Sequence, residues 1–223
     1  MVPFEKERRK PEAMLVAFDF DGTLSGDEMT TFLAERCGVV EQMDTITQRA
    51  MAGEIEYAQS LRERCGLLEG LADEEAGAAF EKVHLRPGAA DVIAALNDAG
   101  VTTAILTGGF DRGVAAALQK ADVTVDRIVA NRLPVAEAQL TGEVEGPLIE
   151  GTKDDALADL AGEYGVEMDE TVAVGDGAND LPMLEVAGLA VGFDPKETVE
   201  PACDVVVESM AELQDVLDAE GVL

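Results

Sequence analysis

Residues 14–24 read MLVAFDFDGTL, and this stretch decides the fold. Its first five residues are apolar without a break, which is typical of a strand buried on both faces of a parallel sheet. Asp19 and Asp21 follow where this strand should end, and Gly22 then permits a sharp change of direction. Because alternate residues of an extended segment point the same way, the two carboxylates are expected to face one centre.

Short apolar runs alternate with helical patterns along most of the remaining chain. The other predicted strands cover residues 101–106, 127–130, 171–174, 189–191 and 204–207. The predicted helices cover residues 89–99, 112–121, 154–164, 180–187 and 211–219. Continuous apolar strands separated by amphipathic helices indicate an α/β fold, with a Rossmann-like parallel sheet core and helices on both faces.

Two segments interrupt this alternation. Residues 27–85 show successive helical patterns without a strand, which predicts a helical cap inserted after the first strand. Residues 133–144 predict a β-hairpin around the QLTG sequence at 139–142. The sequence therefore predicts an α/β core of residues 11–26 and 86–223, a cap of residues 27–85, and a flexible tail at residues 1–10. Met51 and Tyr57 of the cap have helical spacing and are interpreted as core more than as an apolar wall for a ligand.

The composition bounds the possible partners. The chain has 223 residues, with 16 Lys and Arg against 46 Asp and Glu, which gives a net charge of −30. So negative a protein repels phosphate backbones, which excludes nucleic acid as a main partner. The acidic residues are spread along the whole chain, a pattern that favours a halophilic protein whose charges are screened by cytoplasmic salt.

Several classes of site are excluded by residue counts. The chain has one histidine, so a histidine-based triad or a multi-histidine metal site is excluded. Its three cysteines are far apart and lack a CxxC spacing, which favours a reducing cytoplasm without disulfides. No apolar stretch reaches the length of a membrane span, and we expect no signal peptide. We expect a cytoplasmic monomer or homodimer that acts on a small molecule, without nucleic-acid or membrane partners.

Three polar loops each follow a predicted strand directly. They cover residues 19–23, 107–109 and 175–180. Parallel strands end at one edge of their sheet, where ligands bind, so the carboxylates of these loops are expected to converge. Oxygen ligands without histidine or cysteine favour Mg²⁺. Thr107 and the two glycines after it offer a hydroxyl and open backbone amides to phosphate oxygens, and Lys153 adds a positive charge.

At these residues the sequence resembles the haloacid dehalogenase-like phosphatases. The resemblance rests on four motifs in order: DFDGTL at 19–24, Thr107, Lys153 and GDGAND at 175–180. It implies that Asp19 is the nucleophile that accepts the phosphoryl group, and that Asp21 is the general acid and base. It implies that Asp180 orients Lys153. The implied Mg²⁺ ligands are the Asp19 carboxylate, the Asp21 backbone carbonyl and Asp176.

A narrower resemblance concerns the cap. Glu28, SLRERCGLLEGL at 60–71, TGGFDR at 107–112, ANRL at 130–133 and LTGEVEG at 140–146 are similar to phosphoserine phosphatases. In that family Glu28 would pair with the ammonium group of serine and Arg64 with its carboxylate. Thr107, Gly108, Lys153 and Asn179 would contact the phosphate.

Other functions stay open at this point. Gly22 and Thr107 stand where serine is more common in phosphoserine phosphatases, so another small phosphomonoester remains an alternative substrate. Phosphoryl transfer to an alcohol would use the same nucleophile. A non-enzymatic cation-binding protein is a further alternative. However, an EF-hand loop counted from Asp19 would require an acid at position 12, where the chain has Thr30.

Overall fold

The computed structural model describes residues 14–150 and 152–223, so the predicted tail at residues 1–10 lies outside the described residues. Six parallel strands form one sheet in the order β3-β2-β1-β6-β7-β8. They are β1 (Leu15–Phe18), β2 (Thr102–Phe110), β3 (Arg127–Asn131), β6 (Thr171–Gly175), β7 (Leu189–Phe193) and β8 (Val205–Val207). The first strand predicted from the sequence thus lies at the centre of the sheet.

Helices cover both faces of this sheet, which confirms the predicted α/β class. Val16 and Phe18 of β1 belong to one apolar cluster, which includes residues of α5 (Ala89–Ala99), α6 (Asp111–Ala121) and α9 (Met210–Ala219). Leu15 and Ala17 belong to the opposite cluster, with α7 (Lys153–Tyr164) and α8 (Leu181–Val186). Alternate side chains of one continuous apolar run therefore anchor both layers of helices. Three short 3₁₀ helices complete the core: η1 (Met168–Glu170), η2 (Ala178–Asp180) and η3 (Glu200–Ala202).

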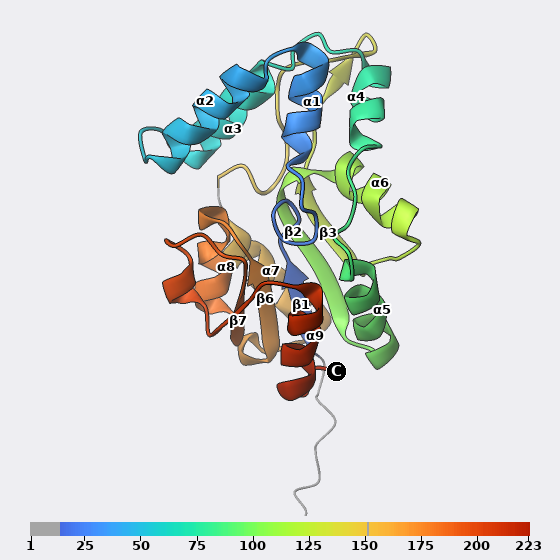
Figure 1. Ribbon diagram of the computed structural model, residues 1–223, viewed down its shortest axis with the longest axis vertical. Coiled ribbons are helices and arrows are strands. Elements are labelled where there is room, and N and C mark those ends of the chain that lie inside the picture. The colour runs from blue at the N-terminus through green and yellow to red at the C-terminus, as the bar shows by residue number, and fades with distance from the viewer. Residues whose placement is uncertain (1–13, 151) are drawn as a thin grey trace, which may run out of the picture.

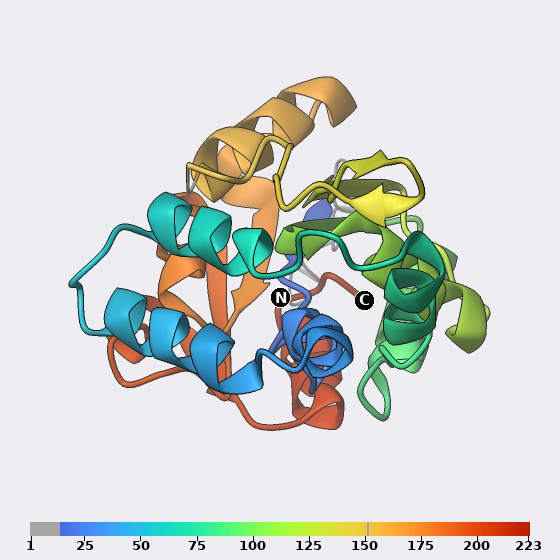
Figure 2. The same cartoon turned by 90° about the horizontal axis from the view of Figure 1, so that it is seen from above.

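Four helices lie over the carboxyl ends of the central strands (Figure 1). They are α1 (Met29–Cys37), α2 (Val40–Met51), α3 (Tyr57–Gly66) and α4 (Asp73–Phe80). Seen from above, α2 and α3 run side by side (Figure 2). Leu33, Met43, Leu61 and Phe80 of these helices are buried in the same apolar cluster as one face of the sheet. The segment between β1 and α5 therefore packs as a layer above the strand ends.

A hairpin formed by β4 (Val135–Ala136) and β5 (Gln139–Leu140) joins this helical layer. Leu140 donates its backbone N–H to the carbonyl of Leu71, and Gly70 donates its N–H to the carbonyl of Leu140. The sequence predicts the hairpin around QLTG at 139–142. Its turn lies instead at Glu137 and Ala138, which both have positive φ, and QL forms the returning strand.

Strand β2 is longer than the sequence predicts. Thr107, Gly108 and Gly109 are predicted in a loop, but they form the end of β2, which continues to Phe110. The register against β3 shifts between Thr107 and Phe110, so the extra residues are accommodated by an irregularity. This extension carries the Thr107 hydroxyl and the two glycines beneath the helical layer.

The two crossings between core and helical layer lie side by side. Ser25, on the way out, bridges to Leu85 on the way back, and Arg86 donates its N–H to the carbonyl of Leu24. The Arg86 guanidinium also donates to the carbonyl of Gly22 at 2.6 Å. Among the helices that the structure describes, none combines the length and apolarity that a membrane crossing requires.

Candidate active site

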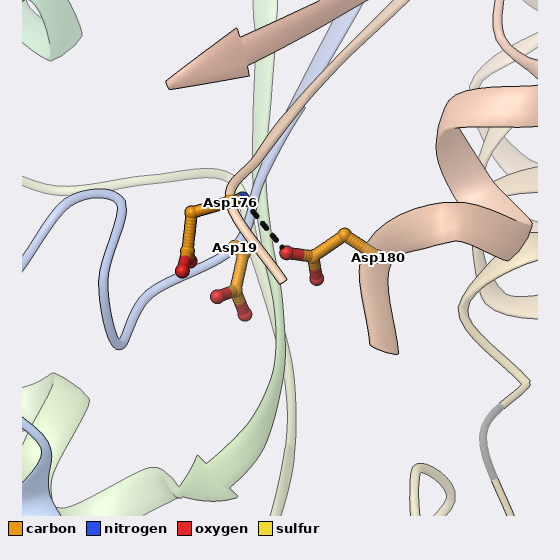
Figure 3. A group of neighbouring side chains, drawn as sticks. All are labelled: Asp19, Asp176 and Asp180. Carbon is orange, nitrogen blue, oxygen red and sulfur yellow. Dashed lines mark hydrogen bonds between the residues drawn. The ribbon is translucent and has the colours of Figure 1, made fainter. Parts of the chain in front are cut away.

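Three carboxylates, one after β1 and two after β6, meet at the carboxyl edge of the sheet (Figure 3). Asp19 directly follows β1, Asp176 directly follows β6, and Asp180 ends η2 just before α8. One oxygen of each lies within 4.8 Å of the others. The parallel strands bring these side chains together, as their positions after predicted strands led us to expect.

Lys153 neutralises part of this cluster from below. It is the first residue of α7 and its side chain is only 2% exposed. Its ammonium lies 2.5 Å from the Asp19 carboxylate and also pairs with Asp180. An ammonium group has three N–H donors, so two are used by these carboxylates and one remains for a further acceptor.

Both oxygens of Asp180 are already occupied by protein donors. One accepts from Lys153 and from the Asn179 side-chain amide, and the other accepts from the backbone N–H groups of Asp176 and Gly177 at 2.9 Å each. Its side chain is fully buried. The carboxylate therefore fixes the position of Lys153 and the start of the loop that carries Asp176, and has little capacity left to ligate a metal.

Asp21 connects the loop after β1 to the first helix above it. One of its oxygens accepts a hydrogen bond of 3.2 Å from the backbone N–H of Met29, at the start of α1. The other oxygen lies so close to Gly109 that a Cβ there would come within 2.6 Å of it. Burial, followed by the charges of Glu28 and Asp19, raises the pKa of Asp21 well above its usual value. The side chain is therefore suited to carry a proton into the site.

The carboxylates carry more negative charge than the nearby lysines balance. Burial and the charge of Asp180 raise the pKa of Asp19 to about 8, although Lys153 opposes this shift. Burial and the Asp180 charge also raise the pKa of Asp176, against the effect of Lys196. A cation between two carboxylates permits both to ionise. The closeness of Asp19 and Asp176 therefore favours the binding of a cation.

The donor set fits a hard divalent cation. Lys153 contacts only one of the two Asp19 oxygens, and the Asp176 carboxylate points toward the loop of Asp21 and Gly22. The carboxylate oxygens at this point are those of Asp19 and Asp176, beside the turn at Gly22. Such an all-oxygen set is what hard divalent cations prefer.

A cavity of about 510 Å³ lies between the carboxylates and the helical layer. The predicted site residues that line it are Asp19, Asp21, Glu28, Arg64, Thr107, Gly108, Asp176 and Asn179. Lys153 and Asp180 lie buried directly beneath it. The structure thus brings every predicted site residue to this cavity or to the buried layer directly beneath it, and Arg64 comes from α3 of the helical layer.

Arg64 has a polar atom without a partner. Its Nε is buried and, within the described residues, makes no hydrogen bond. A buried guanidinium nitrogen that is left unpaired costs free energy, which an acceptor bound in the cavity would recover. Arg64 is therefore placed to bind an anionic group that the protein itself does not supply.

Sequence patterns miss or misplace some residues of the cavity. Met51 is predicted in the core, but it lines the cavity and is 68% exposed. Tyr57, also predicted in the core, does pack against the main apolar cluster, but it lines the cavity as well. Lys196, whose ammonium lies 3.5 Å from Asp176, is not among the predicted site residues. Its position just after β7 is the available signal, because that strand also ends at the ligand-binding edge.

Comparison with known proteins agrees with this geometry. The family model described as haloacid dehalogenase-like hydrolase matches residues 16–185. A phosphoserine phosphatase of Halobacterium salinarum is 54% identical over 93% of this chain and 99% of its own length. A phosphoserine phosphatase of Methanocaldococcus jannaschii is 37% identical over 91% of this chain and 95% of its own length.

Solved structures give the same result. A phospho-aspartyl intermediate analogue of phosphoserine phosphatase superposes with a TM-score of 0.85 at 35% identity, covering 92% of this chain and 99% of the other. A substrate-bound phosphoserine phosphatase complex also superposes with a TM-score of 0.85 at 35% identity, over 94% of this chain and 99% of the other.

Proposed function

The chain belongs to the haloacid dehalogenase-like hydrolases, and we propose that it is a Mg²⁺-dependent phosphatase that converts O-phospho-L-serine into L-serine and phosphate. The observation that carries this proposal is one cavity lined by two chemically different sets of side chains. Asp19 and Asp176, with the Lys153 ammonium paired to Asp19, supply a phosphoryl-transfer site, and Glu28 and Arg64 supply opposite charges. Phosphoserine has a phosphoryl group at one end and an ammonium and a carboxylate at the other.

The first chemical step uses the Asp19 carboxylate as nucleophile. Its free oxygen attacks phosphorus, the bond between phosphorus and the serine oxygen breaks, and an aspartyl-phosphate forms. Asp21 donates its proton to the departing alkoxide, which leaves as the serine hydroxyl. The raised pKa of Asp21 supports this role, because a carboxyl group must hold its proton at neutral pH in order to give it away.

The second step releases phosphate. Asp21, now ionised, takes a proton from a water molecule, whose oxygen attacks phosphorus. The bond between phosphorus and Asp19 breaks, and both carboxylates return to their starting state after product release and proton exchange. Asp21 serves as the acid and then as the base. The hydrogen bond from the Met29 backbone N–H to one of its oxygens supports both roles, because it restrains the carboxyl group at the start of α1.

Lys153 supports both steps as a cation, and Asp180 holds it in position. The charges of Asp180 and Asp19 raise the pKa of Lys153, which keeps it cationic despite burial. Its third N–H is available to a phosphoryl oxygen, where negative charge accumulates during transfer. When bound by Asp19, Asp176 and the Asp21 carbonyl, Mg²⁺ supplies further positive charge to the phosphoryl oxygens.

We assign the serine carboxylate to Arg64 and the serine ammonium to Glu28. We assign the phosphoryl group to Thr107, Gly108 and Asn179, since they line the cavity on the side of the sheet. The cap thus selects the substrate and the core performs the chemistry. We place the enzyme in the cytoplasm, at the step of serine biosynthesis that releases phosphate.

A substitution in the cap tests the substrate assignment. Removing the guanidinium in Arg64→Ala should raise KM for phosphoserine about 10- to 100-fold, the range expected for a lost hydrogen bond to a charged group. KM for phosphoethanolamine, which lacks the carboxylate, should not change. Arg62→Ala is the matched control, because Arg62 lies on the same helix, is 54% exposed and pairs with Glu150 outside the cavity. An equal rise in KM for both esters would contradict the assignment.

A further inference from the structure

The side chain of Tyr57 reaches from the cap to the end of strand β2. Tyr57 is the first residue of α3, and its hydroxyl lies so close to Gly108 that a Cβ on Gly108 would come within 1.8 Å of it. Gly108 belongs to the stretch of β2 that carries Thr107 beneath the cap. The phenol oxygen therefore touches the backbone that lines the floor of the cavity.

The Tyr57 hydroxyl has its hydrogen available. Within residues 14–150 and 152–223, the hydrogen bonds of the neighbouring groups do not involve the Tyr57 hydroxyl. The neighbouring carbonyl of Gly108 already accepts a 3.0 Å hydrogen bond from the Asn131 side-chain amide. The Gly109 N–H beyond it donates to the Thr107 hydroxyl at 2.9 Å. The protein thus satisfies the surrounding groups and leaves the phenol facing the cavity.

Two cations and two carboxylates act on the phenol. The cations Lys153 and Arg64 act more strongly than the carboxylates Asp19 and Asp180, which favours an anion near the hydroxyl. Burial raises the pKa of Tyr57 to about 12, so the hydroxyl keeps its proton throughout the physiological range. A protonated phenol that feels the charge of two cationic side chains can donate a hydrogen bond to a bound anion without adding negative charge.

We propose that the Tyr57 hydroxyl donates a hydrogen bond to a phosphoryl oxygen of the substrate, which makes Tyr57 a phosphoryl-binding residue contributed by the cap. The contact with Gly108 favours the phosphoryl end of the substrate over the end held by Arg64. The inference rests on the proposed function only for the identity of the ester, since any phosphomonoester bound here presents the same oxygen. The consequence is that the phosphoryl group itself holds the cap against the core.

The tyrosine content of the chain permits a direct spectroscopic test. The chain has two tyrosines, Tyr57 and Tyr164, and no tryptophan. Tyr164 lies at the far end of α7, about 16 Å along the helix from Lys153. Tyr164→Phe therefore leaves Tyr57 as the sole tyrosine emitter without touching the cavity. Titrating this variant with inorganic phosphate, with Mg²⁺ present, should produce a saturable change in tyrosine emission. Absence of any change at phosphate concentrations that inhibit the enzyme would overturn the inference.

Inhibition constants supply the second test. Tyr57→Phe keeps the ring and removes only the hydroxyl, and it should weaken inhibition by inorganic phosphate about tenfold, with a matching rise in KM. Tyr164→Phe should leave both constants unchanged, and thermal melting should show that both variants are folded. Unchanged inhibition by phosphate in Tyr57→Phe, or weaker inhibition by L-serine alone, would overturn the inference. Should the wild-type enzyme prefer another ester, the proposed function fails but the phosphate test still decides the role of Tyr57.

Discussion

Gly22 shows how one residue is fixed by the site. Its φ is +91°, and a Cβ at this position would come within 2.4 Å of the Asp176 carboxylate. The sequence shows a glycine at this position, but it does not show what requires it. In this structure the carboxylate of Asp176 fills the space that a side chain at position 22 would need.

We predict that Gly22→Ala weakens Mg²⁺ binding about 10- to 100-fold, as expected when the support of a metal ligand is disturbed. The methyl group would displace Asp176, and the positive φ adds backbone strain. Gly38→Ala is the matched control, since Gly38 has a φ of +68° and nothing lies within 4 Å of the methyl group that alanine would add. Calorimetric Mg²⁺ titrations of both variants in molar KCl check this. Equal Mg²⁺ affinities of the two variants would contradict the prediction, because they would show that a methyl group beside Asp176 does not disturb the metal site.

The raised pKa of Asp19 gives the metal site a pH dependence. With a pKa of about 8 in the metal-free protein, Asp19 is largely protonated at pH 6 and ionised at pH 9. Mg²⁺ must displace this proton below pH 8, so its affinity should rise with pH by up to about tenfold per unit and level off above 8. Titrations at pH 6, 7, 8 and 9 check this, with Asp19→Asn expected to show a shallower slope. A Mg²⁺ affinity that is flat across this range would contradict the prediction.

At the scale of elements, the sequence predicts types better than ends. The central strands and the helices that follow them are predicted because apolar runs and helical periodicity are local signals. The continuation of β2 through Thr107, Gly108 and Gly109 is not, because two glycines favour a loop and the pairing with β3 that resumes at Phe110 is not a local signal. The hairpin turn is misplaced for a related reason. Glu137 and Ala138 lack the preferences of turn residues, whereas the glycine in QLTG has them.

The hairpin turn therefore carries strain that a substitution can relieve. Glu137 and Ala138 have φ values of 51° and 60°, a region that glycine occupies without cost. Ala138→Gly should raise the free energy of unfolding by about 0.5–1 kcal/mol. Ala136→Gly, two residues earlier in the exposed strand β4, should lower it by a similar amount. Urea unfolding at constant KCl measures both variants. A destabilised Ala138→Gly protein would show that the turn is not strained.

At the scale of the whole molecule, the charge dominates. The net charge is −30, and ion pairs such as Arg36 with Glu75 and Lys82 with Glu35 lie at the surface, where each contributes little. Self-repulsion should therefore oppose folding at low salt. The Debye screening length shortens from about 10 Å at 0.1 M salt to about 3 Å at 1 M, so added salt weakens this repulsion.

We expect Tm to rise by at least about 5 °C between 0.1 and 2 M KCl. Differential scanning calorimetry checks this. An equal osmolality of sucrose serves as the control for effects that do not depend on charge, and should give a smaller rise. A Tm that does not change with KCl would contradict the prediction that the protein is adapted to high salt.

The arrangement of the whole molecule decides which site residues can be predicted from the sequence. Asp19, Asp176 and Asp180 are predicted to meet because parallel strands carry them to one edge, and they do lie together. Tyr57 and Lys196 are not predicted to face the cavity. The orientation of Tyr57 depends on how α3 of the helical layer is placed above the sheet, which no local pattern records, whereas Lys196 offers its position just after β7 as a signal.

The central claim is that Asp19 and its neighbours hydrolyse phosphoserine, and phosphate release tests it most directly. Purified protein in molar KCl with Mg²⁺ should release phosphate from O-phospho-L-serine faster than from other small phosphomonoesters, and EDTA should stop it. Asp19→Asn should lower the rate by at least about 10⁴-fold, whereas Asp155→Asn, on the exposed face of α7, should retain it. Equal turnover by Asp19→Asn, or no turnover of phosphoserine by the wild-type protein, would contradict the account.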